Sequence, residues 1–120
     1  MATFSKEKLS ASTDGRGILV VATASSGTTI HTATTVTTTE DEVWLYCQNT
    51  SASAVKLTIQ WGGTTSPNDD IEVTVAAEAG LMLVIPGLIL VGNATALVVR
   101  AFAATGSVLV IHGYVNRITV

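Results

Sequence analysis

Polar and apolar residues alternate along several short segments of the chain. In residues 54–61 the odd-numbered positions are apolar and most even-numbered positions are polar, and residues 70–76 repeat this pattern. A period of two is typical of β-strands that pack one face on a core and expose the other face to water. The pattern therefore predicts a β-rich domain in which these segments are strands.

Turn-forming residues separate such segments at roughly the 8–12-residue spacing that is typical of β-sandwiches and barrels. We expect strands at about 18–24, 28–35, 43–49, 54–61, 70–76, 81–85, 96–103 and 107–116, and a short one at 88–91 beyond Pro86-Gly87. Thr, Val and Ile, which favour strands over helices, make up 42 of the 120 residues. The sequence predicts an all-β fold, a two-layer antiparallel β-sandwich of about eight strands. A jelly-roll-like topology is preferred, and an immunoglobulin-like sandwich is the alternative.

The chain divides into two parts by its pattern. We expect residues 1–14 to form an N-terminal polar arm and residues 15–120 to form a single β-sandwich domain, the size expected for one core. The turn signal Asp-Gly at residues 14–15 marks the boundary.

Two segments are apolar on both faces, residues 97–99 and 108–111. A two-layer sandwich of this length has no third layer to cover their outer faces, so we expect a second subunit to cover them. The side chains expected at this subunit interface are Val98, Arg100, Phe102, Leu109 and Ile111.

The chain carries few charges: 6 Lys and Arg against 9 Asp and Glu give a net charge of −3. This argues against nucleic acid as a partner, since phosphate neutralisation needs a dense basic face. Nothing near the N-terminus marks the chain for export, and the longest apolar run, residues 81–91, is too short for a membrane helix. We therefore expect synthesis in the cytoplasm and no membrane partner. Cys47 is expected to be buried and unreactive.

The residues that could carry chemistry have simpler interpretations. His31 and His112 lie within strand patterns, where we expect hydrogen bonds to backbone or water. The acidic clusters at residues 40–42 and 68–72 are interpreted as solvated loop charges, with calcium binding as the alternative. No motif suggests a catalytic, cofactor-binding or metal-binding residue, so we expect no enzyme and no cofactor.

Two aromatic residues stand apart from the expected core. Val43, Leu45 and Cys47 share one face of their strand, and Trp44 and Tyr46 share the other. This places the two rings on an outward surface, where they could contact a protein neighbour or a sugar.

Several strings of the sequence resemble one protein family. They are LSASTDGRGI at 9–18, GTTIHTA at 27–33, DEVWLY at 41–46, KLTIQWGGTT at 56–65, VIPGL at 84–88 and HGYVNRI at 112–118. This set is similar to small virion proteins of tailed bacteriophages, of the capsid decoration (cement) type. The resemblance covers nearly the whole chain from about residue 9.

The resemblance implies a non-enzymatic protein on the outer surface of the phage head. It would bind the major capsid protein at capsomer junctions and stabilise the shell, as a homotrimer, after synthesis in the host cytoplasm. The alternatives are another virion role (neck, tail or head fibre) and a carbohydrate-binding module. For a capsid-binding arm, we expect contacts from Phe4, Lys6, Lys8 and Leu9, since an arm can add a strand to an exposed sheet edge.

Overall fold

The computed structural model describes residues 2–119 as nine β-strands, and no helix occurs in this part of the chain. The strands are β1 (Thr3–Lys8), β2 (Ile18–Leu19), β3 (Thr28–Thr32), β4 (Thr39–Asn49), β5 (Val55–Trp61), β6 (Asp70–Val75), β7 (Met82–Val91), β8 (Val98–Ala103) and β9 (Leu109–Thr119). The predicted all-β class is confirmed. None of the described residues forms a helix that could span a membrane.

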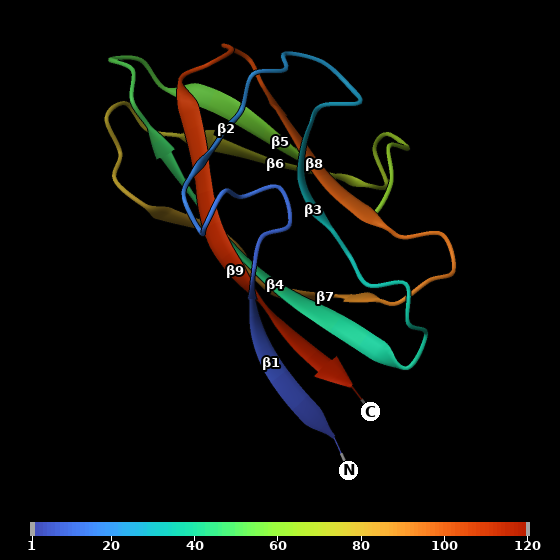
Figure 1. Cartoon of the computed structure of the whole chain (residues 1–120). Coiled ribbons are helices and arrows are strands. Elements are labelled where there is room, and N and C mark those ends of the chain that lie inside the picture. Colours follow the sequence, from blue (N-terminus) through green and yellow to red (C-terminus); the bar gives the residue numbers. More distant parts are fainter. Residues whose placement is uncertain (1, 120) are drawn as a thin grey trace.

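The strands form two antiparallel sheets, packed as the layers of a sandwich (Figure 1). One sheet has the order β1-β9-β4-β7, with β2 also paired to β9, and the other has the order β3-β8-β5-β6. The pairs β2–β9, β3–β8, β4–β7 and β5–β6 are therefore nested, as in one long hairpin folded over into two layers. Such nesting gives the jelly-roll topology rather than the immunoglobulin strand order.

The core lies between the sheets and follows the predicted alternation. Strand β4 buries every second residue along its whole length, and Val43, Leu45 and Cys47 are fully enclosed. Burial raises the pKa of the Cys47 thiol to about 11, so the thiol stays protonated at neutral pH. The expected burial of Cys47 is confirmed.

The N-terminal segment is part of the sandwich. Strand β1, expected as a polar arm, pairs with the C-terminal half of β9, from Thr3 opposite Thr119 to Lys8 opposite Tyr114. Figure 1 shows β1 running beside β9 at the end of the molecule where both termini lie. The side chain of Leu9 is only 1% exposed and belongs to the core. Strand β1 carries few apolar side chains, because it lies at the edge of the sheet and only Glu7 is even partly buried.

Strand β7 is continuous, whereas the sequence predicted a break at Pro86-Gly87. Two irregularities in its pairing with β4 accommodate the extra residues, one at each side of Trp44 and Leu45. Gly87 has a φ of 77°, which a bulge readily uses. Strand β7 is an edge strand, so no strand lies beside its open side. The missing N–H of Pro86 therefore removes no hydrogen bond on that side.

Candidate functional site

The outer face of the five-stranded sheet gathers several exposed aromatic and apolar side chains. We define this outer face by its side chains on the four long strands: Phe4, Lys6 and Lys8 of β1; Glu42, Trp44 and Tyr46 of β4; Leu83, Ile89 and Val91 of β7; and His112, Tyr114, Asn116 and Ile118 of β9. Alternation places those of β4 and β9 there, because every second residue of these strands points inward, and pairing with β9 puts those of β1 on the same side. The expected outward position of Trp44 and Tyr46 is confirmed.

Two rings form the centre of the outer face. Trp44 and Tyr114 lie directly opposite each other on β4 and β9, with ring centroids 6.3 Å apart and planes 12° apart. The Lys6 ammonium lies 4.7 Å from the centroid of the Tyr114 ring, a cation–π arrangement. The centre therefore presents aromatic surface with a positive charge at one side.

Hydrogen bonds hold this centre in place. The indole N–H of Trp44 donates to Oε1 of Glu42 at 2.7 Å, and Nδ2 of Asn116 donates to the same oxygen at 3.0 Å. The Asn116 bond first, and then the Trp44 bond, lower the pKa of Glu42 because both favour its ionised form. A β-carbon on Gly87 would lie 2.8 Å from Cζ2 of Trp44, so the indole packs directly on the glycine backbone.

An uncharged strip borders the centre on its β7 side. Leu83, Ile89 and Val91 point outward and remain close to half exposed. Residues 81–92 contain no charged side chain, and no strand of the described chain covers the open edge of β7. Edge strands of soluble proteins usually carry charges that prevent pairing with another chain, so this strip is available for a protein contact.

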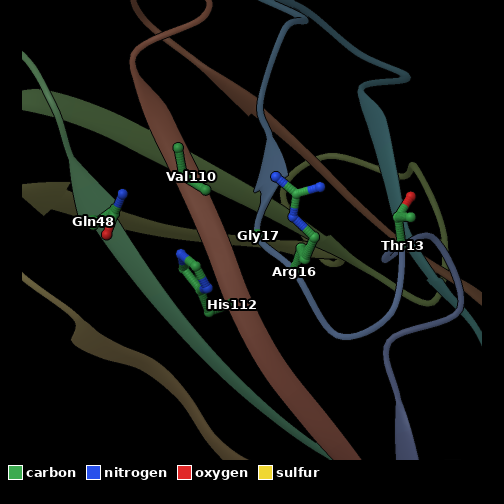
Figure 2. Close-up of a pocket in the computed structure, with 6 residues that line it drawn as sticks. All are labelled: Thr13, Arg16, Gly17, Gln48, Val110 and His112. Carbon is green, nitrogen blue, oxygen red and sulfur yellow. The ribbon is translucent and has the colours of Figure 1, made fainter.

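A hollow of about 360 Å³ lies at the other end of the outer face. Figure 2 shows its walls: Gln48 from β4, Val110 and His112 from β9, and Thr13, Arg16 and Gly17 from the loop that joins β1 to β2. The loop thus covers part of the outer face of β9. This explains why residues 108–111 are apolar on both faces: Val110 is partly covered by the chain itself, at Gly17.

A buried polar cluster joins the two sheets, in a place where the sequence analysis predicted solvated charges. Asp41, expected in a solvated acidic loop, is fully buried in β4. Its carboxylate accepts hydrogen bonds from Nε and Nη2 of Arg117 at 2.7 and 3.0 Å and contacts Nε2 of His31 at 2.8 Å. Nδ1 of His31 accepts a bond from the Ser10 backbone N–H at 3.1 Å. We call His31, Asp41 and Arg117 the inner cluster.

The inner cluster helps to hold the loop after β1 against β3. Nδ1 of His31 receives the backbone N–H of Ser10, while the Ser10 hydroxyl accepts a bond from the Thr32 N–H at 2.6 Å. The expected backbone hydrogen bond of His31 is confirmed, and the carboxylate partner is additional. One sequence signal points to it: Asp41 has the same parity as Val43 and Leu45, so extending the alternation by one step places it inward.

The residues expected in the capsid-binding arm are divided between the surface and the core. Phe4, Lys6 and Lys8 lie on the outer face, with Phe4 being 74% exposed, but Leu9 is buried. Leu9 is therefore a core residue, and the expectation of a surface contact for it is corrected.

The expected interface residues lie on different layers. Val98, Arg100 and Phe102 alternate with buried residues of β8 and lie half-buried on the outer face of the four-stranded sheet. Leu109 and Ile111 are fully buried between the sheets. They are core residues, because β9 turns its odd-numbered positions inward, and they cannot contact a second subunit.

The acidic clusters give no metal centre in residues 2–119, where no three His, Cys, Asp or Glu side chains converge. In the second cluster, Asp69 instead accepts the Thr65 N–H at 3.0 Å and so closes its own loop.

Comparison of the chain with models of protein families, with curated proteins and with solved structures finds no match.

Proposed function

We propose that this chain is a non-enzymatic structural protein of a tailed-bacteriophage virion, a decoration or cement protein of the head. It binds the major capsid protein on the outer surface of the shell, at capsomer junctions, and stabilises the shell. The observation that carries the proposal is the outer face, which combines ordered aromatic rings with an uncharged strip. The resemblance of the sequence supports it independently.

The outer face has the properties of a protein-binding surface. Binding energy at protein interfaces concentrates in a few aromatic and Arg side chains that are surrounded by less critical contacts. Trp44 and Tyr114 are such rings: the hydrogen bond to Glu42 orients the Trp44 indole before any partner arrives, and Tyr114 stacks against it. Rings that are already ordered lose less conformational entropy on binding.

The proposed role is mechanical. DNA packed in a head pushes the shell outward, and a protein attached to adjacent capsomers opposes their separation. Each copy needs only modest affinity when several contacts act together, since linked contacts raise the overall affinity. The compact jelly roll, with both termini at one end of the sheet, provides a rigid body for this purpose (Figure 1).

A homotrimer is part of the proposal. Leu109 and Ile111 are buried in the core, so the expected subunit interface lacks two of its five side chains. Self-association then needs another apolar surface. The uncharged strip at β7 provides one, because it has no like charges to repel a second copy. Native mass spectrometry of the isolated chain tests this: a trimer supports it, and a monomer at all concentrations contradicts it.

The first experiment is the copy number of the chain in purified particles of the source phage, by quantitative mass spectrometry. A copy number comparable with that of the major capsid protein supports a decoration role over the whole head. A far smaller number assigns the chain to the neck, the tail or a head fibre. Its complete absence from particles overturns the virion role.

The binding surface is tested with paired aromatic variants. Trp44→Ala removes the ring at the centre of the outer face, and Phe102→Ala removes a half-buried ring from the outer face of the other sheet. We expect Trp44→Ala to weaken binding to undecorated heads by more than about tenfold, as central aromatic residues typically do. Phe102→Ala should bind like the wild type. Equal binding by both variants would contradict the assignment of this face.

A carbohydrate-binding module is the second candidate, because an aromatic ring on a jelly roll can also stack on a sugar. The same Trp44→Ala variant separates the two candidates on a glycan array. Glycan binding by the wild type that is lost in the variant would favour the sugar. Absence of glycan binding by the wild type removes this candidate.

A further inference from the structure

We propose that the hollow beside Arg16 is a binding site for a carboxylate group. This inference goes beyond the proposed function and rests on the charge and the hydrogen-bonding groups of the hollow walls and on the ordered backbone of the loop. Of the six lining residues, only Arg16 has a permanent charge and none is acidic. A single positive charge matches a singly charged carboxylate better than a doubly charged phosphate.

The guanidinium of Arg16 has no partner within residues 2–119. Arg117 is bound to Asp41, and Arg100 donates to the Thr29 hydroxyl at 3.2 Å, but the Arg16 side chain makes neither an ion pair nor a hydrogen bond there. Even Asp14 in the same loop does not pair with it. Its forked donors are therefore available, and this fork fits a carboxylate in bidentate geometry.

The loop holds the backbone of Arg16 in a fixed place. The Ser12 hydroxyl donates to the Arg16 carbonyl at 2.9 Å, and the Arg16 N–H donates to the Thr13 carbonyl at 2.9 Å. Ser12 is buried, so this anchor is protected from water. Gly17 packs so closely on Val110 and His112 that a side chain there has no room. The loop backbone is thus ordered before a ligand arrives, while the exposed Arg16 side chain is left to orient toward the ligand.

The remaining walls supply hydrogen bonds and an apolar surface. The Thr13 hydroxyl and the Gln48 amide are donors, and Figure 2 shows Gln48 and His112 on adjacent strands beside the loop. Nε2 of His112 is buried without a hydrogen-bond partner in the described chain. The atom lies against the Gly17 backbone, and leaving it unpaired costs free energy that a bound water or ligand group would recover. Val110 offers contact to the carbon atoms of the ligand.

The size of the hollow limits the ligand. Its volume of about 360 Å³ is at the lower end of the range for small-molecule pockets. It fits a small organic acid or the side chain of one Asp or Glu from a partner protein. Both supply the same carboxylate chemistry, and the experiment below distinguishes these two sources.

The test is a titration of the full chain with sodium acetate, followed by amide NMR against sodium chloride at equal ionic strength. We expect saturable shifts at Arg16, Gly17 and His112. Arg16→Gln should weaken acetate binding at least about tenfold, since hydrogen bonds between charged groups are lost. Arg100→Gln, a change of the same charge on the other sheet, should leave it unchanged. Shifts that do not saturate, or that persist in Arg16→Gln, overturn the proposal.

The source of the carboxylate is tested with undecorated heads. Weaker binding of Arg16→Gln to heads, and competition by acetate, identify an acidic side chain of the shell. Saturable acetate binding with unchanged head binding identifies a free organic acid. The two proposals fail separately: acetate binding without head binding overturns only the virion role, and head binding without acetate binding overturns only the carboxylate site.

Discussion

Asp41 and Glu42 are neighbours on β4, and their carboxylates face opposite sides of the same sheet. Each accepts hydrogen bonds from two other residues: Asp41 from His31 and Arg117, and Glu42 from Trp44 and Asn116. Arg117 and Asn116 are likewise neighbours on β9. One register between two strands thus builds two polar groups at once, the inner cluster between the sheets and the ordered centre of the outer face.

The two groups differ in what surrounds them. Asp41 is fully buried, and its partners come from both sheets, so the inner cluster connects the layers. Glu42 and its partners all lie on one sheet and remain open to solvent. A buried charge must keep its partners or destabilise the fold, whereas the same bonds at a surface mainly orient side chains. We therefore expect changes to the inner cluster to affect stability and changes to the outer face to affect binding.

The largest effect is expected from Asp41→Asn. It removes the charge that faces the buried His31 side chain and the partly exposed Arg117 side chain, and removing one partner of a buried pair costs up to about 3–5 kcal/mol of unfolding free energy. Urea unfolding followed by circular dichroism measures the loss. The matched control is Glu42→Gln, the same chemical change one residue further on, which should have a much smaller effect. Equal losses in both variants would show that the two faces do not differ.

The second effect is a loss of stability in acid. Burial alone raises the pKa of Asp41, but the bonds from His31 and Arg117 outweigh it and lower the pKa from 3.8 to about 2. Because the pKa is lower in the folded protein, the ionised carboxylate stabilises the fold at pH values above its pKa in the unfolded chain. This stabilisation is lost as the pH falls from about 4 through about 2.

The size of this effect is about 2 kcal/mol, since each pKa unit corresponds to about 1.4 kcal/mol. Urea unfolding at a series of pH values checks it, with Asp41→Asn as the reference because the variant lacks the titrating group. The advantage of the wild type over the variant should fall by about 2 kcal/mol as the pH falls through this window. A constant difference between the two chains would assign the loss in acid to other carboxylates.

Sequence reasoning reached these regions to different degrees. The alternation in β4 predicted Val43, Leu45 and Cys47 inside and Trp44 outside, because a period of two is a local property of a strand. Strand β1 was missed because its residues are polar and its pairing depends on β9, at the far end of the chain. The break predicted at Pro86-Gly87 was wrong because an edge strand accepts a proline and a bulge.

The sites depend even more on distant contacts. The partners of Asp41 come from residues 31 and 117, and no local pattern relates them. The hollow forms only where the loop containing Arg16 folds over His112 on the last strand. The topology of the fold brings these groups together. The sequence therefore indicated candidate residues but not which of them lie in contact.

A third effect is expected at Gly87, which connects the fold to the outer face. Gly87→Ala places a methyl group against the Trp44 indole in a left-handed backbone conformation. We expect a loss of about 1–2 kcal/mol in stability, from the backbone conformation alone, and a change in the Trp44 environment in tryptophan fluorescence. Gly80→Ala is the control, since nothing lies within 4 Å of its added carbon. Identical fluorescence in both variants would contradict the packing of Trp44 on Gly87.

The smallest effect is expected from a change of Lys6, whose ammonium lies over the Tyr114 ring on the outer face. A cation–π contact at an exposed site contributes about 0.5–1 kcal/mol, far less than the inner cluster. A double-mutant cycle with Lys6→Gln and Tyr114→Leu isolates this coupling in urea unfolding, because each single change also alters local packing. A coupling near zero would mean that β1 is held by its backbone pairing to β9 alone. The positive charge beside the rings would then be available to a partner without any cost to the fold.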